Sequence, residues 1–217
     1  MKQKISFILL ITIILINNLY SQNPNANSKE DSLKTDISKQ DEIENLLKSN
    51  NKININKAID SVLTKPNQYN PIILYAISHQ LFEKNKKDEA MFWYYVAQLR
   101  ARYDTNLCLD ENAKQLTGFL GMMFGQDINP YAFKNIKKLK NTIDKVISFV
   151  RNNDEEYDHR WLNILGMKTN GEKNDEIDYT KIESKPKEEW SKIKEETIKN
   201  YYIEFEEALK EFKKSKK

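Results

Sequence analysis

The sequence predicts an all-α protein of stacked antiparallel helical hairpins, closed by a long helix at its C-terminus. The 217 residues include only five glycines and five prolines, which is few for a fold rich in strands and turns. Lysine, glutamate, leucine and isoleucine are abundant, and these residues suit helices. Apolar side chains also recur at the three- and four-residue spacing of helices over most of the chain.

The N-terminus is predicted to be an export signal. Lys2 and Lys4 precede an apolar run of 12 residues, "ISFILLITIILI", which is shorter than the ~20 residues of a membrane-spanning helix. The following "NNLYSQ" suits cleavage after Ser21, and it resembles the signal peptides of exported Bacteroidetes proteins. We therefore predict a signal peptide over residues 1–21, a flexible lead over 22–36 and one α-helical domain over 37–217. A retained membrane anchor is the alternative for the first segment.

The charge balance argues against a nucleic-acid partner. The chain has 35 basic and 32 acidic residues, and loss of Lys2 and Lys4 with the signal leaves a net charge of +1. Nucleic-acid-binding domains present a strongly basic face, whereas these charges are interspersed. The single cysteine, Cys108, cannot form an internal disulfide. Its place between leucines predicts a buried, small apolar side chain.

The first half of the domain is predicted to contain short helices and then a hairpin. A weak apolar face begins near Ile37, and a short helix follows over residues 55–63. Asn70 is a suitable N-cap and Pro71 a suitable first residue for the next helix. The turn "KNKK" separates that helix from another beginning near Asp88. So short a connection requires the two helices to be antiparallel neighbours.

The second helix of the hairpin contains a run of four aromatic residues, Phe92 to Tyr95. At about 100° per residue, its apolar side chains cover two sides of the helix. A helix that is apolar around most of its circumference is buried, so we interpret this run as core, with an exposed binding patch as the alternative. The two sides consist of Ala90, Trp93, Tyr94, Ala97 and Ala101, and of Phe92, Tyr95, Val96, Leu99 and Tyr103.

Four residues of the hairpin follow the spacing of a known helical repeat: Ser78 in its first helix, and Ala90, Tyr94 and Ala97 in its second. This spacing resembles one tetratricopeptide-type unit, covering residues 71–104. Arg102 stands where that family has its closing proline, and no second copy is visible at the family's period of about 34 residues. The resemblance implies stacked helical hairpins and a role in binding another protein.

The second half of the domain is predicted to be helical as well. Asp110 suits the start of a helix that contains "GFLGMMFG". Asn129 and Pro130 are predicted to cap and begin the next helix, whose apolar stripe continues to Val150. The remaining elements are expected to be a short helix over residues 155–167, a loop over 168–184, and a long helix from about Pro186 to Lys214.

No motif for catalysis or cofactor binding appears in the sequence. We find no phosphate-binding loop, dinucleotide fingerprint, paired-cysteine motif, zinc-protease helix or nucleophile elbow. His79 is interpreted as a structural histidine. Glu155 and His159 lie four residues apart, next to Asp158, but a metal site would need a further ligand from elsewhere. A solvated acidic helix start is the preferred interpretation, and we predict no catalytic residue, metal or cofactor.

The candidate binding residues lie near the end of the aromatic helix. Arg100 and Arg102 are the only charged residues between Ala90 and Tyr103, so their head groups are expected to leave the core there and meet an acidic partner surface. Stabilisation of the helix dipole, with a local pair between Arg100 and Asp104, is the alternative. The predicted binding set is Arg100, Arg102, Tyr95, Tyr103 and Trp93.

These features predict an exported, non-catalytic helical module that binds another protein in the periplasm or outside the cell. One version is an immunity-type protein that neutralises a toxin in the cell envelope. Two alternatives are an envelope hydrolase that uses Glu155, Asp158 and His159, and a structural envelope component without a discrete ligand. Nucleic acid and a membrane span beyond the signal are not expected.

Overall fold

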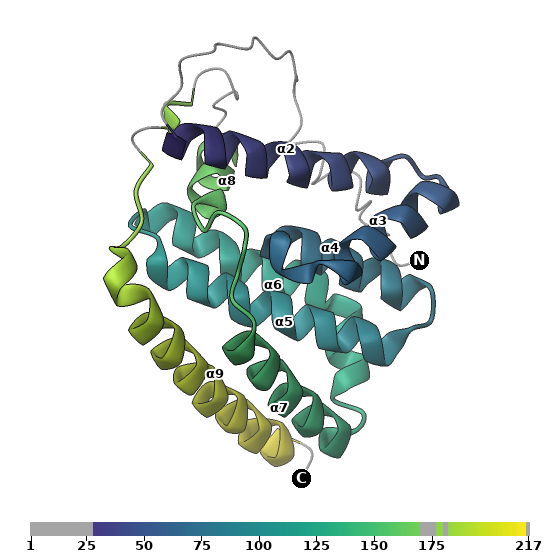
Figure 1. The fold of residues 1–217 in the computed structure, drawn as a ribbon. Coiled ribbons are helices and arrows are strands. Elements are labelled where there is room, and N and C mark those ends of the chain that lie inside the picture. Colours follow the sequence, from purple (N-terminus) through teal and green to yellow (C-terminus); the bar gives the residue numbers. More distant parts are fainter. Residues whose placement is uncertain (1–27, 170–176, 180–181, 216–217) are drawn as a thin grey trace.

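The computed structural model describes residues 28–169, 177–179 and 182–215. These residues form eight α-helices and one 3-10 helix (Figure 1), which confirms the all-α prediction. The predicted signal over residues 1–21 lies outside the described part. The elements are α2 (Ser28–Lys48), α3 (Lys52–Thr64), η1 (Pro66–Gln68), α4 (Pro71–Glu83), α5 (Lys87–Leu107), α6 (Glu111–Ala132), α7 (Ile136–Asn152), α8 (Trp161–Thr169) and α9 (Lys187–Ser215).

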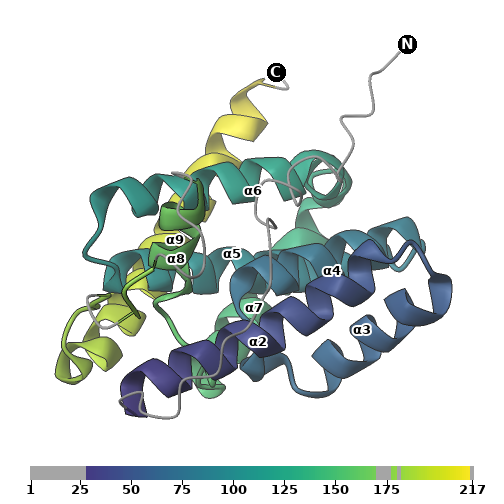
Figure 2. The same cartoon turned by 90° about the horizontal axis from the view of Figure 1, so that it is seen from above.

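Helix α5 is the centre of the molecule. It packs against α4, α6, α7 and α9, and Figure 2 shows α6 and α2 on opposite sides of it. Because α5 has neighbours all round, both of its apolar sides are covered, and Tyr94, Val96 and Leu99 are fully buried. The interpretation of the aromatic run as core is therefore confirmed for Trp93, Tyr94 and Tyr95, while Phe92 is only partly buried.

The α4–α5 pair has the expected hairpin form. Asn70 caps α4 by accepting a hydrogen bond from the backbone N–H of Ile73, and Pro71 occupies the first helical position. The two helices are joined by three residues, and Asn85 in this turn has a φ of 64°. Asparagine tolerates this left-handed conformation better than most side chains do, so the local sequence explains the tight reversal.

The N-terminal boundary of the domain differs from the prediction. The helix expected from Ile37 begins at Ser28, so residues 28–36 of the predicted flexible lead are helical. The later part of this helix is held by tertiary contact, because Ile43 and Leu47 are buried in the core. Polar composition alone therefore misplaced this boundary.

The boundary between α6 and α7 also differs. Asn129 and Pro130 do not begin a helix but lie near the end of α6. The amide of Asn129 accepts a hydrogen bond from the Tyr95 hydroxyl at 3.0 Å, so it is engaged by α5 and does not cap α7. The cap of α7 is Asn135, whose side chain accepts from the backbone N–H of Lys138. Proline is tolerated at position 130 because the carbonyl that loses its helical donor belongs to the exposed Gln126.

The C-terminal helix follows its predicted range closely, since α9 runs over Lys187–Ser215 and packs against α5 and α7. Short extended segments meet where Cys108 pairs with Ser184 in an isolated bridge. Cys108 is buried, as predicted. Within the described ranges, we find no helix with the length and apolar character needed to cross a membrane.

We predict that Trp93→Ala lowers the free energy of unfolding by ~3–5 kcal/mol, the range for a large buried aromatic side chain. The Trp93 ring packs edge-on against Phe92 and Phe149, with centroid distances of 5.1 and 5.5 Å. Urea unfolding followed by far-UV circular dichroism measures the loss. Tyr202→Ala removes an aromatic that is 42% exposed and should cost far less. An equal loss in the two variants would place Trp93 outside the core.

Candidate functional site

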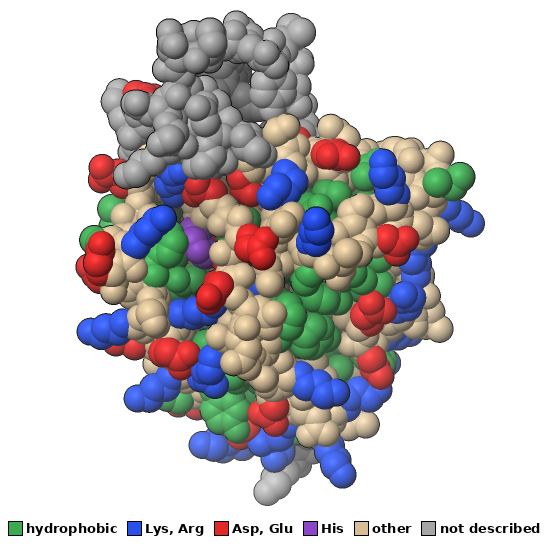
Figure 3. Space-filling model, viewed as in Figure 1, with side chains coloured by type: hydrophobic (Ala, Val, Ile, Leu, Met, Phe, Trp, Pro, Cys, Tyr) green, Lys and Arg blue, Asp and Glu red, His purple; other side chains and the backbone are tan. Residues whose placement is uncertain are grey.

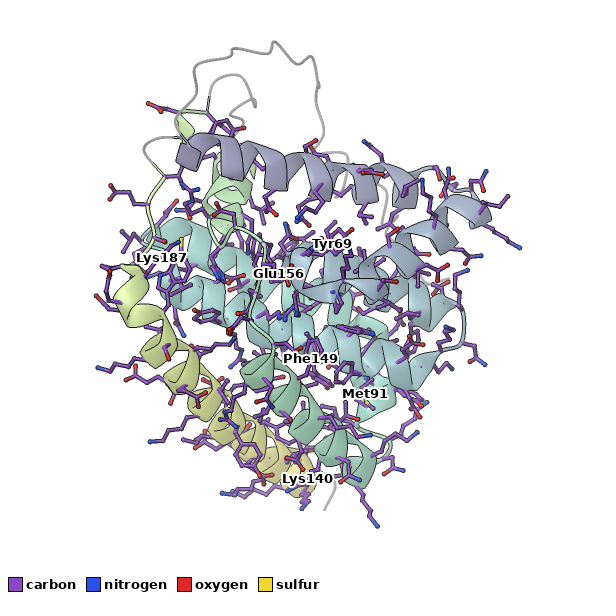
Figure 4. All side chains as sticks on the ribbon, in the orientation of Figure 1. Tyr69, Met91, Lys140, Phe149, Glu156 and Lys187 are labelled. Carbon is purple, nitrogen blue, oxygen red and sulfur yellow. The ribbon has the colours of Figure 1, made fainter. Side chains whose placement is uncertain are left out.

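Arg100 lies inside the protein, so the expectation that its head group leaves the core is wrong. Its side chain has no exposed area. The guanidinium donates to the Pro66 carbonyl at 3.1 Å and to the Asn67 side-chain oxygen at 2.6 Å, both in η1. It also lies 5.3 Å from the ring centroid of Phe149, a residue of α7 that is labelled in Figure 4. Arg100 therefore has a structural position, and no partner surface can contact it in this conformation.

The charge of Arg100 is balanced by a carboxylate from the segment after α7. Arg100 Nε lies 3.3 Å from Glu155 Oε1, and Glu155 Oε2 accepts from Lys194 of α9 at 2.9 Å. The Arg100–Glu155 contact is an ion pair without hydrogen-bond geometry, because neither of its two atoms has a hydrogen-bond partner in the described part of the chain. Lys194 also pairs with the exposed Asp154 at 3.1 Å. This network joins α5, the 153–160 segment and α9.

Asp104, one turn beyond Arg100, is a second buried charge on α5. It does not make the predicted local pair, since the contacts of Arg100 run to Glu155 and η1. Its carboxylate accepts from the Tyr157 hydroxyl at 2.9 Å and from Trp161 Nε1 at 2.6 Å. Asp104 Oδ1 also lies 2.6 Å from His159 Nδ1. Three side chains of one segment are thus fixed by one carboxylate.

The neighbours of His159 decide its charge. Burial lowers its pKa, but the Asp104 carboxylate, with smaller effects from Glu155 and Asp158, outweighs burial and raises the pKa above its ordinary value of 6.5. The imidazole therefore carries a proton to higher pH than a free histidine does. The ring is enclosed by edge-on contacts with Tyr103, Tyr157 and Trp190.

The acidic segment around His159 is not the helix start that we predicted, because α8 begins only at Trp161. Each candidate side chain has its own partner: Glu155 pairs with Arg100 and Lys194, His159 with Asp104, and Asp158 with Arg160 at 2.7 Å. The backbone of residues 153–160 is not helical, so Glu155 and His159 are not held on one helix face as predicted. Among the described residues, we find no group of three histidine, cysteine or carboxylate side chains that could hold a metal ion.

Asp36 ties α2 to the same segment. Its carboxylate accepts from the backbone N–H of Asp158 at 3.3 Å and from Gln40 at 3.2 Å. Gln40 in turn donates to the Gln68 carbonyl at 3.1 Å. Burial raises the pKa of Asp36 from 3.8 to about 6, despite these hydrogen bonds. Gln68 of η1 also donates to Glu156 at 3.0 Å; Glu156 is labelled in Figure 4.

Arg102 lies apart from this network, at the surface between α5 and α9. Its side chain is 40% exposed, its Nη1 contacts Glu204, and its guanidinium lies 5.0 Å from the ring centroid of Tyr201. It lines a cavity of about 280 Å³ between α5 and α6, which we call the α5–α6 cavity. The other lining residues are Tyr75 of α4, Tyr94, Gln98 and Ala101 of α5, and Thr117, Gly118, Gly121, Met122 and Asn129 of α6.

Two tyrosines of the α5–α6 cavity differ in how their hydroxyls are satisfied. Tyr94 donates to the Gly121 carbonyl at 2.8 Å and accepts from Asn129 at 3.3 Å. The Tyr75 hydroxyl is buried and has no hydrogen-bond partner within the described ranges, although its ring stacks on Phe124 at 5.2 Å. An unsatisfied buried hydroxyl costs about 1–3 kcal/mol. A buried polar group without a partner therefore requires an explanation.

The predicted binding residues are therefore divided among several environments. Arg102 alone is substantially exposed, whereas Trp93, Tyr95 and Tyr103 are buried. Sequence reasoning missed Asp104 as the partner of His159, and it missed Tyr75 in the cavity. No local signal in the sequence identifies either residue. Tyr75 occupies a position that fits the apolar pattern of α4. The partners Tyr157 and His159 of Asp104 are more than 50 residues away in the sequence.

Comparison with known proteins gives no relative from which a function could be transferred: no family model matches this chain, and neither a curated protein nor a solved structure matches it.

We predict that Glu155→Ala lowers the free energy of unfolding by ~3–5 kcal/mol, because Arg100 would remain buried without its counter-charge. Glu204→Ala is the matched control: it breaks the exposed contact with Arg102 and should cost at most ~1 kcal/mol. Urea unfolding at pH 7 measures both. Equal, small losses would show that the buried pair contributes no more than the exposed one.

Asp36 should make stability depend on pH. Because the folded-state pKa is raised to about 6, the folded protein holds this proton more tightly than the unfolded chain does. Protonation of Asp36 therefore stabilises the folded state fully below about pH 4, and this contribution is lost as the pH rises through about 6. A shift of roughly two units corresponds to at most ~3 kcal/mol.

Asp36→Asn should remove this dependence. The free energy of unfolding of the unmodified protein, relative to that of the variant, should fall by up to ~3 kcal/mol between pH 4 and pH 7. Asp60→Asn, at an exposed position of α3, is the control for carboxylate titration elsewhere. If the free energy of unfolding changes with pH in the same way in both variants, Asp36 is not the group responsible for the pH dependence of stability.

Proposed function

We propose that this protein is an exported, non-catalytic module that binds another protein through the outer side of α6 and the adjoining Arg102. The observation that carries this proposal is a pair of exposed apolar side chains on α6. Phe119 is 44% exposed and Met122 is 67% exposed. They lie three residues apart and are therefore neighbours on the helix surface. We call Phe119, Met122 and Arg102 the α6 face.

The composition of the α6 face suits a protein partner. Protein interfaces are enriched in aromatic residues, methionine and arginine. Met122 and Arg102 both line the α5–α6 cavity, so an apolar side chain and a positive charge adjoin a hollow that a partner's side chain can enter. On the face seen in Figure 3, basic and acidic side chains are interspersed. Arg102 supplies the positive charge of the α6 face for an acidic group of the partner.

The rest of the proposal follows from the sequence. The short apolar run and "YSQ" support export with cleavage after Ser21, and an immunity-type role against an envelope toxin is the concrete version. The packed α4–α5 hairpin supports a tetratricopeptide-like arrangement in which α9 closes the stack. The Arg100 and Asp104 networks support a non-catalytic role, because they engage the titratable groups around His159 in structural pairs.

The test is capture of partners from the organism's own envelope fraction by the mature protein. The double variant Phe119→Ser, Met122→Ser should keep its thermal midpoint and lose at least ~90% of the captured partner, as hot-spot residues would. Ile53→Ser changes a 76% exposed apolar residue on α3 and should retain the partner. If the unmodified protein, the double variant and the Ile53→Ser variant capture the partner equally, the α6 face is not the binding surface.

A further inference from the structure

The inner end of the α5–α6 cavity contains an unused hydrogen-bonding group. Tyr75 comes from α4 and is fully buried, and its hydroxyl has no partner in the part of the chain that the structure describes. Burial, with smaller effects from Tyr94 and Tyr201, holds the pKa of Tyr75 well above its ordinary value. The hydroxyl therefore remains a donor throughout the physiological pH range.

Gly121 leaves space beside that hydroxyl. A Cβ added to Gly121 would lie 3.6 Å from the Tyr75 oxygen and 3.6 Å from Gln98 Nε2. These are ordinary contact distances, so the missing side chain leaves room for one atom of a ligand between the two groups. Gln98 closes this end: its amide nitrogen donates a long hydrogen bond to the Tyr94 hydroxyl at 3.4 Å, and its amide oxygen accepts from the Tyr201 hydroxyl at 2.9 Å.

Arg102 supplies the only charge among the residues that line the cavity. Glu204, which is not among the lining residues, already contacts the Arg102 guanidinium. Both side chains of that pair are substantially exposed, and exposed pairs are weak, so a second carboxylate can share or replace the contact. A guanidinium has five N–H donors, more than one carboxylate uses.

We propose that the α5–α6 cavity receives a carboxylate side chain of the partner protein, a glutamate or an aspartate, with Arg102 binding it at the mouth and the Tyr75 hydroxyl donating to it at the inner end. The inference rests on the proposed function, whose partner it specifies. A volume of about 280 Å³ is just below the ~300–1,000 Å³ typical of small-molecule pockets. A cavity of that volume accommodates one carboxylate side chain of a protein. Entry requires Gln98 to turn aside and to release its hydrogen bond from Tyr201.

The probes for this site are N-acetyl-glutamate methylamide and N-acetyl-glutamine methylamide, which differ only in the charged group. Titration of the mature, ¹⁵N-labelled protein should give saturable shifts of the amide signals of Gly118 and Gly121. The glutamate probe should bind with a dissociation constant in the millimolar range, and the glutamine probe should bind at least about tenfold more weakly. Equal binding of the two probes, or shifts that do not saturate, would overturn the proposal.

A pair of glycine substitutions tests the location. Gly121→Ala places a methyl group against Tyr75 and Gln98, whereas a Cβ at Gly118 meets nothing within 4 Å. Both remove a helical glycine from α6, so both should fold at least as well as the unmodified protein. Gly121→Ala should weaken the glutamate probe at least about tenfold, and Gly118→Ala should not. The same affinity in both variants contradicts the proposed location.

Two further variants separate the contributing groups. Tyr75→Phe removes only the unpartnered hydroxyl, so it should leave the thermal midpoint unchanged or higher and weaken the glutamate probe. Arg102→Gln should abolish the preference for the glutamate probe over the glutamine probe. If Tyr75→Phe binds the glutamate probe like the unmodified protein, the hydroxyl does not contact the carboxylate and the proposal fails.

Partner capture distinguishes this inference from the function on which it rests. If Gly121→Ala loses the partner and the α6-face double variant also loses it, both are supported. If Gly121→Ala keeps the partner while the double variant loses it, the docking face stands and the carboxylate site is wrong. If the glutamate probe binds in the cavity but the double variant keeps its partner, the proposed face is wrong and the cavity retains only its preference for carboxylates.

Discussion

The structure depends on two charged side chains buried one turn apart on α5. Arg100 binds η1 and pairs with Glu155, and Asp104 binds Tyr157, His159 and Trp161. Buried charges are tolerated only where partners compensate their lost hydration. The 153–160 segment and Trp161 of α8 supply most of those partners, so the non-helical path of this segment is a requirement of the core. Lys194 extends the same network to α9.

This arrangement explains why neighbouring arginines have opposite environments. Residues 100 and 102 are two positions apart on a helix, so their side chains point to roughly opposite sides. One side of α5 faces η1 and the 153–160 segment, and the other faces α6 and α9. Arg100 is therefore enclosed, while Arg102 reaches solvent beside Glu204 and the α5–α6 cavity. Arg102 is therefore the arginine that is available to bind a partner, because Arg100 is engaged in the internal network.

The polar groups on the two sides of α5 also differ in how well they are satisfied. Around Asp104, hydroxyl, indole and imidazole groups converge on one carboxylate, which fixes their positions. In the α5–α6 cavity, Tyr94 is fully engaged while the adjacent Tyr75 hydroxyl is not. Well-satisfied networks stabilise a single structure. An unsatisfied buried donor is different, because a ligand that accepts its hydrogen bond removes the cost of leaving the donor unpaired and so stabilises the complex. This contrast separates the structural side of the helix from the candidate binding side.

The sequence by itself determined the helical class, the α4–α5 hairpin with its Asn70 cap, the burial of the aromatic run and nearly the full extent of α9. These depend on the spacing of apolar residues and on local capping, which act within a few residues of one another. Only the tertiary structure decided the end of α6, the non-helical path before α8 and the burial of Arg100. Each of these depends on partners distant in the sequence, such as Tyr95 for Asn129, Glu155 for Arg100 and Asp104 for His159. A buried ion pair and an exposed one use the same residue types, so which arginine lies inside follows from what packs over the helix.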